Sequence, residues 1–153
     1  MMLRAEVAAF LDDYAVCLDE GHLERWPDYF GPDALYRVTS WENHERNLAH
    51  SLIYCDGRQM IVDRAVAIRQ TTVYERRRLR HFHSALVIQQ ETPDIRIRTN
   101  FLVIESLSDR DPQVFLVGTT HDTLERVDGR LRFKSRLCVY DNYRILTSLI
   151  MPV

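Results

Sequence analysis

The chain has 153 residues, a formal net charge of −2 at pH 7, 46% hydrophobic residues and 27% charged residues. This length and composition are typical of one soluble globular domain, and no apolar run is long enough to cross a membrane. The near-neutral charge supplies no overall field that would favour binding to nucleic acid or to an anionic membrane.

The first part of the chain is predicted to be mainly helical. Its apolar side chains recur at the i, i+3, i+4 spacing of an amphipathic helix that Gly21 ends: Val7, Phe10, Leu11, Tyr14, Ala15 and Leu18. A short second helix is expected over residues 22–30, and residues 31–33 are expected to turn the chain into a short strand over 34–39. Residues 43–49 are predicted to form a loop, and a third helix is predicted over about residues 59–69.

From residue 80 onward the period of the apolar residues changes to two. Four runs then indicate strands, over residues 80–90, 96–107, 114–126 and 130–143, with turn residues between them that suit antiparallel neighbours. In the last run, apolar residues expected in the core alternate with basic residues expected in water: Leu131, Phe133, Leu137 and Val139 against Arg130, Arg132, Lys134 and Arg136. Helices followed by strands predict an α+β fold, with about three helices packed on one face of a curved antiparallel sheet.

A single domain over residues 1–153 is expected, because no repeat, low-complexity segment or Pro/Gly-rich linker divides the chain. Acidic residues interrupt the first twenty positions, so we expect no secretory signal and a cytoplasmic location. The cysteines are odd in number and widely spaced, which disfavours a disulfide framework and indicates buried thiols: Cys17, Cys55 and Cys138.

The sequence disfavours a metal centre. A Rieske centre needs Cys-x-His and Cys-x-x-His pairs to hold its two irons, and no cysteine here has either partner. His81 and His83 are two residues apart on a predicted strand, so they face the same side and form the best metal-like pair. Because no carboxylate is assigned to complete the set, we predict that these histidines bind no metal and form structural hydrogen bonds.

Catalytic motifs are equally scarce. The chain has no Gly-x-Ser-x-Gly nucleophile elbow and no glycine-rich phosphate loop. His121 and Asp122 are adjacent on a strand, so their side chains leave opposite faces, although either could pair with a residue of another strand. Tyr14, on the inner face of the first helix, could donate a hydrogen bond into an apolar pocket, but core packing is the favoured interpretation. A candidate pocket would therefore contain Tyr14, His81, His83 and Asp122.

A run of basic residues lies before the first long strand: Arg76, Arg77, Arg78 and Arg80. Such a run could bind phosphate. The preceding Glu75 and the near-neutral chain favour a solvated face or a subunit contact instead.

The order of elements resembles the cone-shaped nuclear-transport-factor-like fold, which ketosteroid isomerases and many small subunits share. Within that fold, several segments resemble the β subunits of bacterial aromatic-ring-hydroxylating dioxygenases: WPDYF at 26–30 with ALYRVT at 34–39, YER at 74–76 with RH at 80–81, NFLV at 100–103 and DGRLR at 128–132. The similarity covers nearly the whole chain. Among subfamilies it is closest to small subunits of oxygenases that act on aromatic carboxylates, of the terephthalate and salicylate type.

The resemblance implies an α3β3 hexamer in the catabolism of aromatic compounds. In that assembly the α subunit holds the Rieske 2Fe-2S cluster, the mononuclear iron and the substrate, and the β subunits form a trimer that scaffolds it. This chain would then carry no cofactor, no metal and no catalytic residue. The arginine run is placed, as a hypothesis, at or near an inter-subunit contact.

The alternative is a freestanding isomerase, dehydratase or cyclase that uses the interior of the cone. Tyr14 lies seven residues before Gly21, where ketosteroid isomerases keep their oxyanion-hole tyrosine, but the position of their general-base aspartate falls at Val38, which cannot take a proton. A dehydratase-like pairing of His81 or His83 with Asp122 stays open at this point. So does a small-molecule-binding module, because one fold supports many functions.

Overall fold

A long amphipathic helix opens the fold. In the computed structural model, which describes residues 1–70, 77–142 and 151–153, helix α1 spans Met2–Asp19. Its buried side chains lie on one side, as the apolar spacing predicted: Val7, Leu11, Tyr14, Cys17 and Leu18. Gly21 adopts a φ of +75°, a conformation that glycine enters without steric cost, and the helix has ended before it.

The segment after α1 differs from its prediction. Within residues 22–30 only the 3-10 turn η1 (Trp26–Tyr29) forms, so the predicted second helix is wrong in all but one turn. Strand β1 (Phe30–Ser40) begins directly after it and includes residues 31–33, which were predicted as a turn. These residues form an irregularity in the strand, because the register with the neighbouring strand shifts between Phe30 and Leu35.

Two short elements follow that the sequence did not reveal. Residues 43–49, predicted as a loop, include part of the short helix α2 (Trp41–Glu45), whose first turn is capped by the Ser40 hydroxyl accepting from the Asn43 N–H at 3.2 Å. Strand β2 (Ile53–Asp56) has only four residues, too few for a clear alternation signal. Helix α3 (Arg58–Gln70) confirms the third predicted helix to within one residue at each end.

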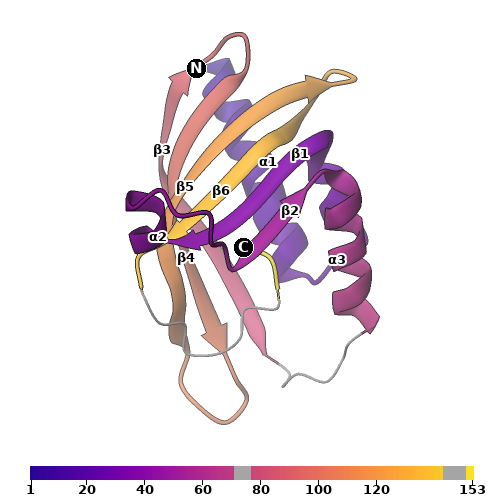
Figure 1. The fold of residues 1–153 in the computed structure, drawn as a ribbon. Helices are drawn as coiled ribbons and strands as arrows, with labels where there is room; N and C mark the ends of the chain where they lie inside the picture. Colours follow the sequence, from indigo (N-terminus) through magenta and orange to yellow (C-terminus); the bar gives the residue numbers. More distant parts are fainter. Residues whose placement is uncertain (71–76, 143–150) are drawn as a thin grey trace.

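The strands form one six-stranded sheet in the order β2-β1-β6-β5-β4-β3. Strands β3 (Arg78–Gln90), β4 (Ile95–Ser106), β5 (Gln113–Val127) and β6 (Arg130–Tyr140) make the predicted antiparallel meander. Strand β1 pairs in parallel with β6, so the sheet is mixed and not wholly antiparallel. In Figure 1, α1 runs behind the curved sheet and α3 stands beside β2 at one edge. The α+β prediction is confirmed.

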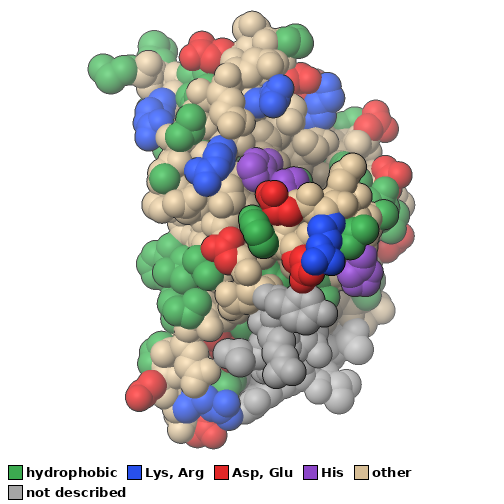
Figure 2. All heavy atoms as spheres, turned by 60° about the vertical axis from the view of Figure 1, so that its left-hand side comes forward, with side chains coloured by type: hydrophobic (Ala, Val, Ile, Leu, Met, Phe, Trp, Pro, Cys, Tyr) green, Lys and Arg blue, Asp and Glu red, His purple; other side chains and the backbone are tan. Residues whose placement is uncertain are grey.

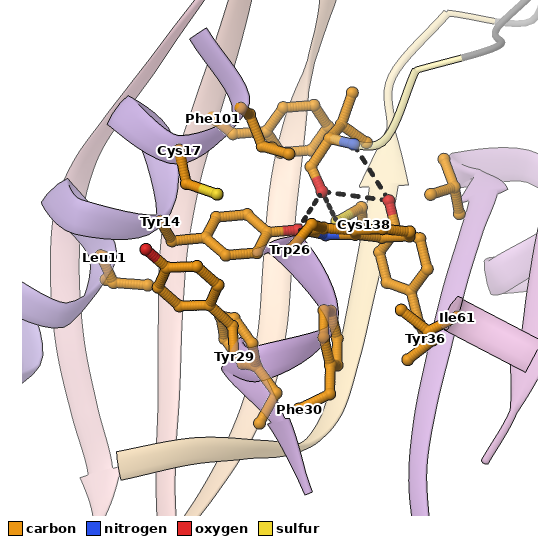
Figure 3. Packing of buried hydrophobic residues seen from close by; sticks show 14 of the residues in the cluster. Leu11, Tyr14, Cys17, Trp26, Tyr29, Phe30, Tyr36, Ile61, Phe101 and Cys138 are labelled. Carbon is orange, nitrogen blue, oxygen red and sulfur yellow. Dashed lines mark hydrogen bonds between the residues drawn. The ribbon is translucent and has the colours of Figure 1, made fainter. Parts of the chain in front are cut away.

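Aromatic rings fill the space between α1 and the sheet. Phe133 of β6 is fully buried, and the ring centroids of Phe10, Tyr14 and Phe30 lie 4.9, 5.2 and 5.3 Å from its own. Figure 3 shows Tyr14, Tyr29 and Phe30 packed together in this layer. The contacts of Phe10 and Tyr14 with Phe133 are edge-to-face, an arrangement that stabilises a core beyond the area that it buries.

An irregularity in β6 reverses part of its predicted pattern. Two adjacent residues of β5 pair with Phe133 and with Ser135, which are not adjacent in β6. Lys134, which lies between them, is therefore an extra residue in β6. Beyond an extra residue the side chains of a strand exchange faces. Arg136, predicted to lie in water, is therefore buried, whereas Leu137, predicted to lie in the core, is only half-buried.

The surface is mixed in character. In the face shown in Figure 2, acidic and basic side chains are interspersed with apolar ones. None of the helices described here is both long and apolar enough to span a membrane. The three cysteines are buried free thiols, as the sequence predicted.

Candidate functional site

Tyr14 lies inside the cone, and its hydroxyl group both accepts and donates a hydrogen bond. The oxygen accepts from Nε1 of Trp26 at 3.1 Å, and the hydroxyl donates to the carbonyl oxygen of Val153 at 3.1 Å. Figure 3 shows the Tyr14 hydroxyl beside Trp26 and Cys138. Burial raises the pKa of the Tyr14 phenol well above its ordinary value, so the group stays protonated and acts as a donor.

Asp122 of β5 and Arg136 of β6 form an ion pair inside the cone. Nη1 of Arg136 donates to Oδ2 of Asp122 at 2.6 Å, and the two residues are only 7% and 2% exposed. The guanidinium carbon also lies 4.7 Å from the ring centroid of Tyr14. Burial raises the pKa of the Asp122 carboxyl to about 6, against the opposing effect of the Arg136 charge. The sequence concealed Arg136, because nothing in the alternation of β6 marks the extra residue before it.

The two candidate histidines contact carboxylates of α1, and Asp122 is not their partner. Nδ1 of His81 lies 2.7 Å from Oδ1 of Asp19, and the backbone N–H of His81 donates to the same oxygen at 3.0 Å. Nε2 of His83 lies 3.1 Å from Oδ1 of Asp12, whose side chain is 71% exposed. Both contacts join β3 to α1, so in this structure the histidines connect two elements of the scaffold.

Three of the four candidate pocket residues border one cavity. Tyr14, His81 and His83 line it together with Arg136, but its volume is only about 30 Å³. That space holds about one or two water molecules, whereas small-molecule sites usually measure about 300–1,000 Å³. Asp122 borders a different hollow of about 310 Å³, which it shares with His121. The space beside Tyr14, His81 and His83 is thus too small for a substrate.

The described residues also offer no metal centre. Over residues 1–70, 77–142 and 151–153, no group of three His, Cys, Asp or Glu side chains is placed to hold a metal ion. The described residues thus form a small cone-shaped α+β domain with a buried ion pair and little open space beside Tyr14.

The predicted arginine run divides between two environments. Nη1 of Arg77 donates to Oε2 of Glu105 at 2.7 Å, and both side chains are nearly buried. Arg78 and Arg80 are exposed on β3, where they are accessible to a partner. Arg76 lies outside the described residues.

Comparison with known proteins identifies the family. The family model described as "Ring hydroxylating beta subunit" matches residues 14–147. The chain is 32% identical, over 100% of both chains, to subunit beta 1 of the terminal oxygenase component of terephthalate 1,2-dioxygenase from a Comamonas species. It is 31% identical to the small subunit of anthranilate 1,2-dioxygenase from Burkholderia cepacia, over 97% of this chain and 92% of that one.

A solved structure supports the same conclusion. A crystal structure assigned to the β subunit of an aromatic-ring-hydroxylating dioxygenase from Novosphingobium aromaticivorans superposes with a TM-score of 0.88. It shares 30% identity and covers 98% of this chain and 95% of that one. The chain belongs to the ring-hydroxylating dioxygenase β-subunit family, which confirms the resemblance and the cone-shaped fold expected from the sequence.

Proposed function

We propose that this chain is a non-catalytic structural subunit of a Rieske-type aromatic-ring-hydroxylating dioxygenase. The observation that carries the proposal is the filled interior of the cone, where only about 30 Å³ of space borders Tyr14 and the two candidate histidines. A freestanding isomerase or dehydratase would need room there for its substrate and a base within reach of it. The chain therefore acts as one domain that supports a separate catalytic subunit.

The partner in this proposal is an α subunit that carries the Rieske cluster and the mononuclear iron. The two subunits assemble as an α3β3 hexamer in the cytoplasm, and the β subunits form a trimer within it. The proteins similar in sequence are named as subunits of terephthalate and anthranilate dioxygenases, whose substrates are aromatic carboxylates. We extend that substrate class to the assembled enzyme. Exposed Arg78 and Arg80 are proposed to lie at an inter-subunit contact.

Co-expression with the α subunit of the same organism tests the proposal. We expect the two chains to co-purify as a complex whose mass, measured by analytical ultracentrifugation, corresponds to three copies of each. Iron should be found with the α subunit, and this chain purified alone should contain none. Purification of the two chains as separate species, or turnover of an aromatic substrate by this chain alone, would contradict the proposal.

A pair of charge-reversal variants tests the proposed contact. The double variant Arg78→Glu/Arg80→Glu should lower the yield of the mixed complex, because acidic groups would replace basic ones at the interface. Arg130→Glu changes another exposed arginine of the sheet and serves as the matched control. Equal yields from the two variants would place the contact elsewhere.

A further inference from the structure

A row of side chains crosses the face of the sheet that lies opposite α1. Its members are successive register partners, one from each of the adjacent strands β4, β5, β6 and β1: Arg98, His121, Leu137 and Arg37. Partners in register point to the same side of a sheet. Their neighbours in sequence point to the other side and are buried: Thr99, Asp122, Arg136 and Val38. The row therefore lies on the outer face of the sheet, which is the face toward the viewer in Figure 1.

A second row on the outer face completes a hollow. It contains the register partners two positions further along the same strands: Arg96, Thr123, Ser135 and Leu35. The two rows, without Arg98, line a hollow of about 310 Å³, and all of its described lining residues belong to strands. Sites for small molecules usually enclose most of the ligand. A hollow whose described lining comes from one sheet is better suited to an occupant that brings its own cover, such as a folded protein.

The charge of the outer face indicates the chemistry of that occupant. Among the described residues, Arg96 and Arg98 take part in no ion pair, and Nε of Arg37 donates to the neutral Oγ of Ser51 at 3.1 Å. Burial and neighbouring positive charges, among them Arg98, lower the pKa of His121. A carboxylate close to the ring would act in the opposite direction. A complementary partner therefore presents carboxylates to these basic groups.

Apolar side chains continue the outer face toward β3. Phe82, Leu102 and Val117 are register partners in β3, β4 and β5, and they form an apolar patch in which Phe82 is 55% exposed. His81 and His83, on either side of Phe82, contact carboxylates of α1, so the Phe82 ring points outward. Exposed apolar patches rimmed by polar residues mark protein interfaces.

The arginines proposed above as a subunit contact border the same apolar patch. Arg78 and Arg80 lie on the same side of β3 as Phe82, and Arg80 is the register partner of Ile104 in β4. The patch thus has basic residues at both ends, since Arg98 precedes Leu102 in β4 and Arg80 lies beyond it. Figure 2, which brings the β3 side of the sheet forward, shows hydrophobic side chains gathered beside Lys and Arg side chains.

We propose that the outer face of the sheet is the docking surface for the α subunit. Carboxylates of the α subunit pair with Arg37, Arg96 and Arg98, and its apolar side chains cover Phe82 and Leu102. This inference rests on the proposed function and deepens it, because it assigns the face of the contact and its chemistry. Two copies of this chain that met through their outer faces would bring like charges together, which disfavours that pairing.

Co-expression with an affinity-tagged α subunit tests the basic part of the surface. Arg96→Glu/Arg98→Glu should lower the amount of this chain recovered per α subunit about tenfold or more, because attractions become repulsions. Arg96→Lys/Arg98→Lys keeps the charges and should recover most of the complex. Arg25→Glu/Arg69→Glu makes the same change of charge at exposed residues outside the sheet, so it is the matched control and should leave recovery unchanged.

A second pair of variants tests the apolar part. Phe82→Ser should also lower recovery about tenfold, because it removes an anchor of the interface. Met60→Ser changes an exposed apolar residue of α3 and is the matched control. Circular dichroism of each purified chain checks the fold, and melting temperatures close to that of the wild type are expected, because the replaced side chains are not part of the core.

Three results would overturn the proposal, and they are distinguishable. A wild-type chain that does not co-purify with the α subunit would contradict the proposed function as well. Equal recovery of the wild type, the outer-face variants and the controls would leave that function standing and place the docking surface elsewhere. If Arg96→Glu/Arg98→Glu still binds the α subunit but changes the mass of this chain alone in analytical ultracentrifugation, the outer face joins copies of this chain.

Discussion

Asp122 and Arg136 are direct register partners of β5 and β6, and their side chains form a 2.6 Å ion pair inside the cone. The pair lies just beyond Lys134, the extra residue of β6. A slip of the strand by one residue would turn Arg136 outward and leave the Asp122 carboxylate buried without its partner. The ion pair therefore specifies the register of the two strands as well as the polarity of the interior.

Replacement of Arg136 should be strongly destabilising. Arg136→Met keeps an apolar side chain of similar length but leaves the Asp122 carboxylate unpaired, so we expect a loss of about 3–5 kcal/mol in the free energy of unfolding. Arg126→Met is the matched control, because Arg126 pairs with Glu6 on the surface and such pairs contribute at most about 1 kcal/mol. Urea unfolding followed by circular dichroism measures both. Similar losses in the two variants would argue against an energetic role for the buried pair.

The same pair predicts a pH dependence of stability. Burial raises the pKa of Asp122 to about 6 in the folded protein, from 3.8 in the unfolded chain. The folded state therefore binds its proton more tightly, and this contribution to stability is present below pH 3.8 and lost as the pH rises through 6. Relative to Asp122→Asn, the wild-type chain should lose about 3 kcal/mol of stability between pH 3.8 and pH 7.

Unfolding curves of the wild type and of Asp122→Asn at several pH values test this sign. The variant cancels the contributions of other titrating groups, because both chains share them. If the free energy of unfolding of the wild type, relative to that of Asp122→Asn, increased as the pH rises, attraction to Arg136 would outweigh the effect of burial on Asp122.

Much of the fold was predictable because its long elements have strong periodicity. The apolar spacing of α1 and the alternation in β3 to β5 gave these elements nearly their observed bounds. The sequence did not reveal β2, α2 or the parallel pairing of β1 with β6. These features depend on contacts between segments distant in sequence, and short elements carry too few residues for a pattern to emerge.

The candidate site was less predictable, and its residues explain why. Tyr14, His81 and His83 do lie around one cavity, but their partners could not be inferred from spacing. Asp19 reaches His81 across 62 positions of sequence, and the Val153 carbonyl reaches Tyr14 across 139. Such pairs are set by the packing of α1 on the sheet, and neither partner carries a local motif.

At two glycines of the sheet, an added methyl group should lower the stability of the fold by different amounts. In Gly118→Ala the new Cβ would overlap the backbone carbonyl oxygen of Val139, which cannot move without disturbing the pairing of β5 with β6. We expect a loss of about 3 kcal/mol or more. In Gly31→Ala the overlap is with the carboxylate end of Glu125, a flexible side chain that can rotate away. Thermal and urea unfolding should rank Gly118→Ala well below Gly31→Ala in stability, and the reverse order would contradict the backbone argument.

The structural role makes His83 dispensable for the reaction of the assembled enzyme. Among the ion pairs of the described residues, the His83 ring takes part in one, with the exposed carboxylate of Asp12. The neighbouring cavity has no room for a substrate. In the complex with the α subunit, His83→Gln should change turnover of an aromatic substrate by less than about twofold, whereas loss of a general base lowers rates by about 100-fold or more.

His81→Gln is the companion variant: it removes a more buried contact with Asp19, so it should lower the melting temperature of this subunit while turnover per assembled complex stays unchanged. Steady-state rates normalised to the amount of purified complex separate these effects. A fall of about 100-fold in turnover by either fully assembled variant would indicate that the replaced histidine takes part in catalysis.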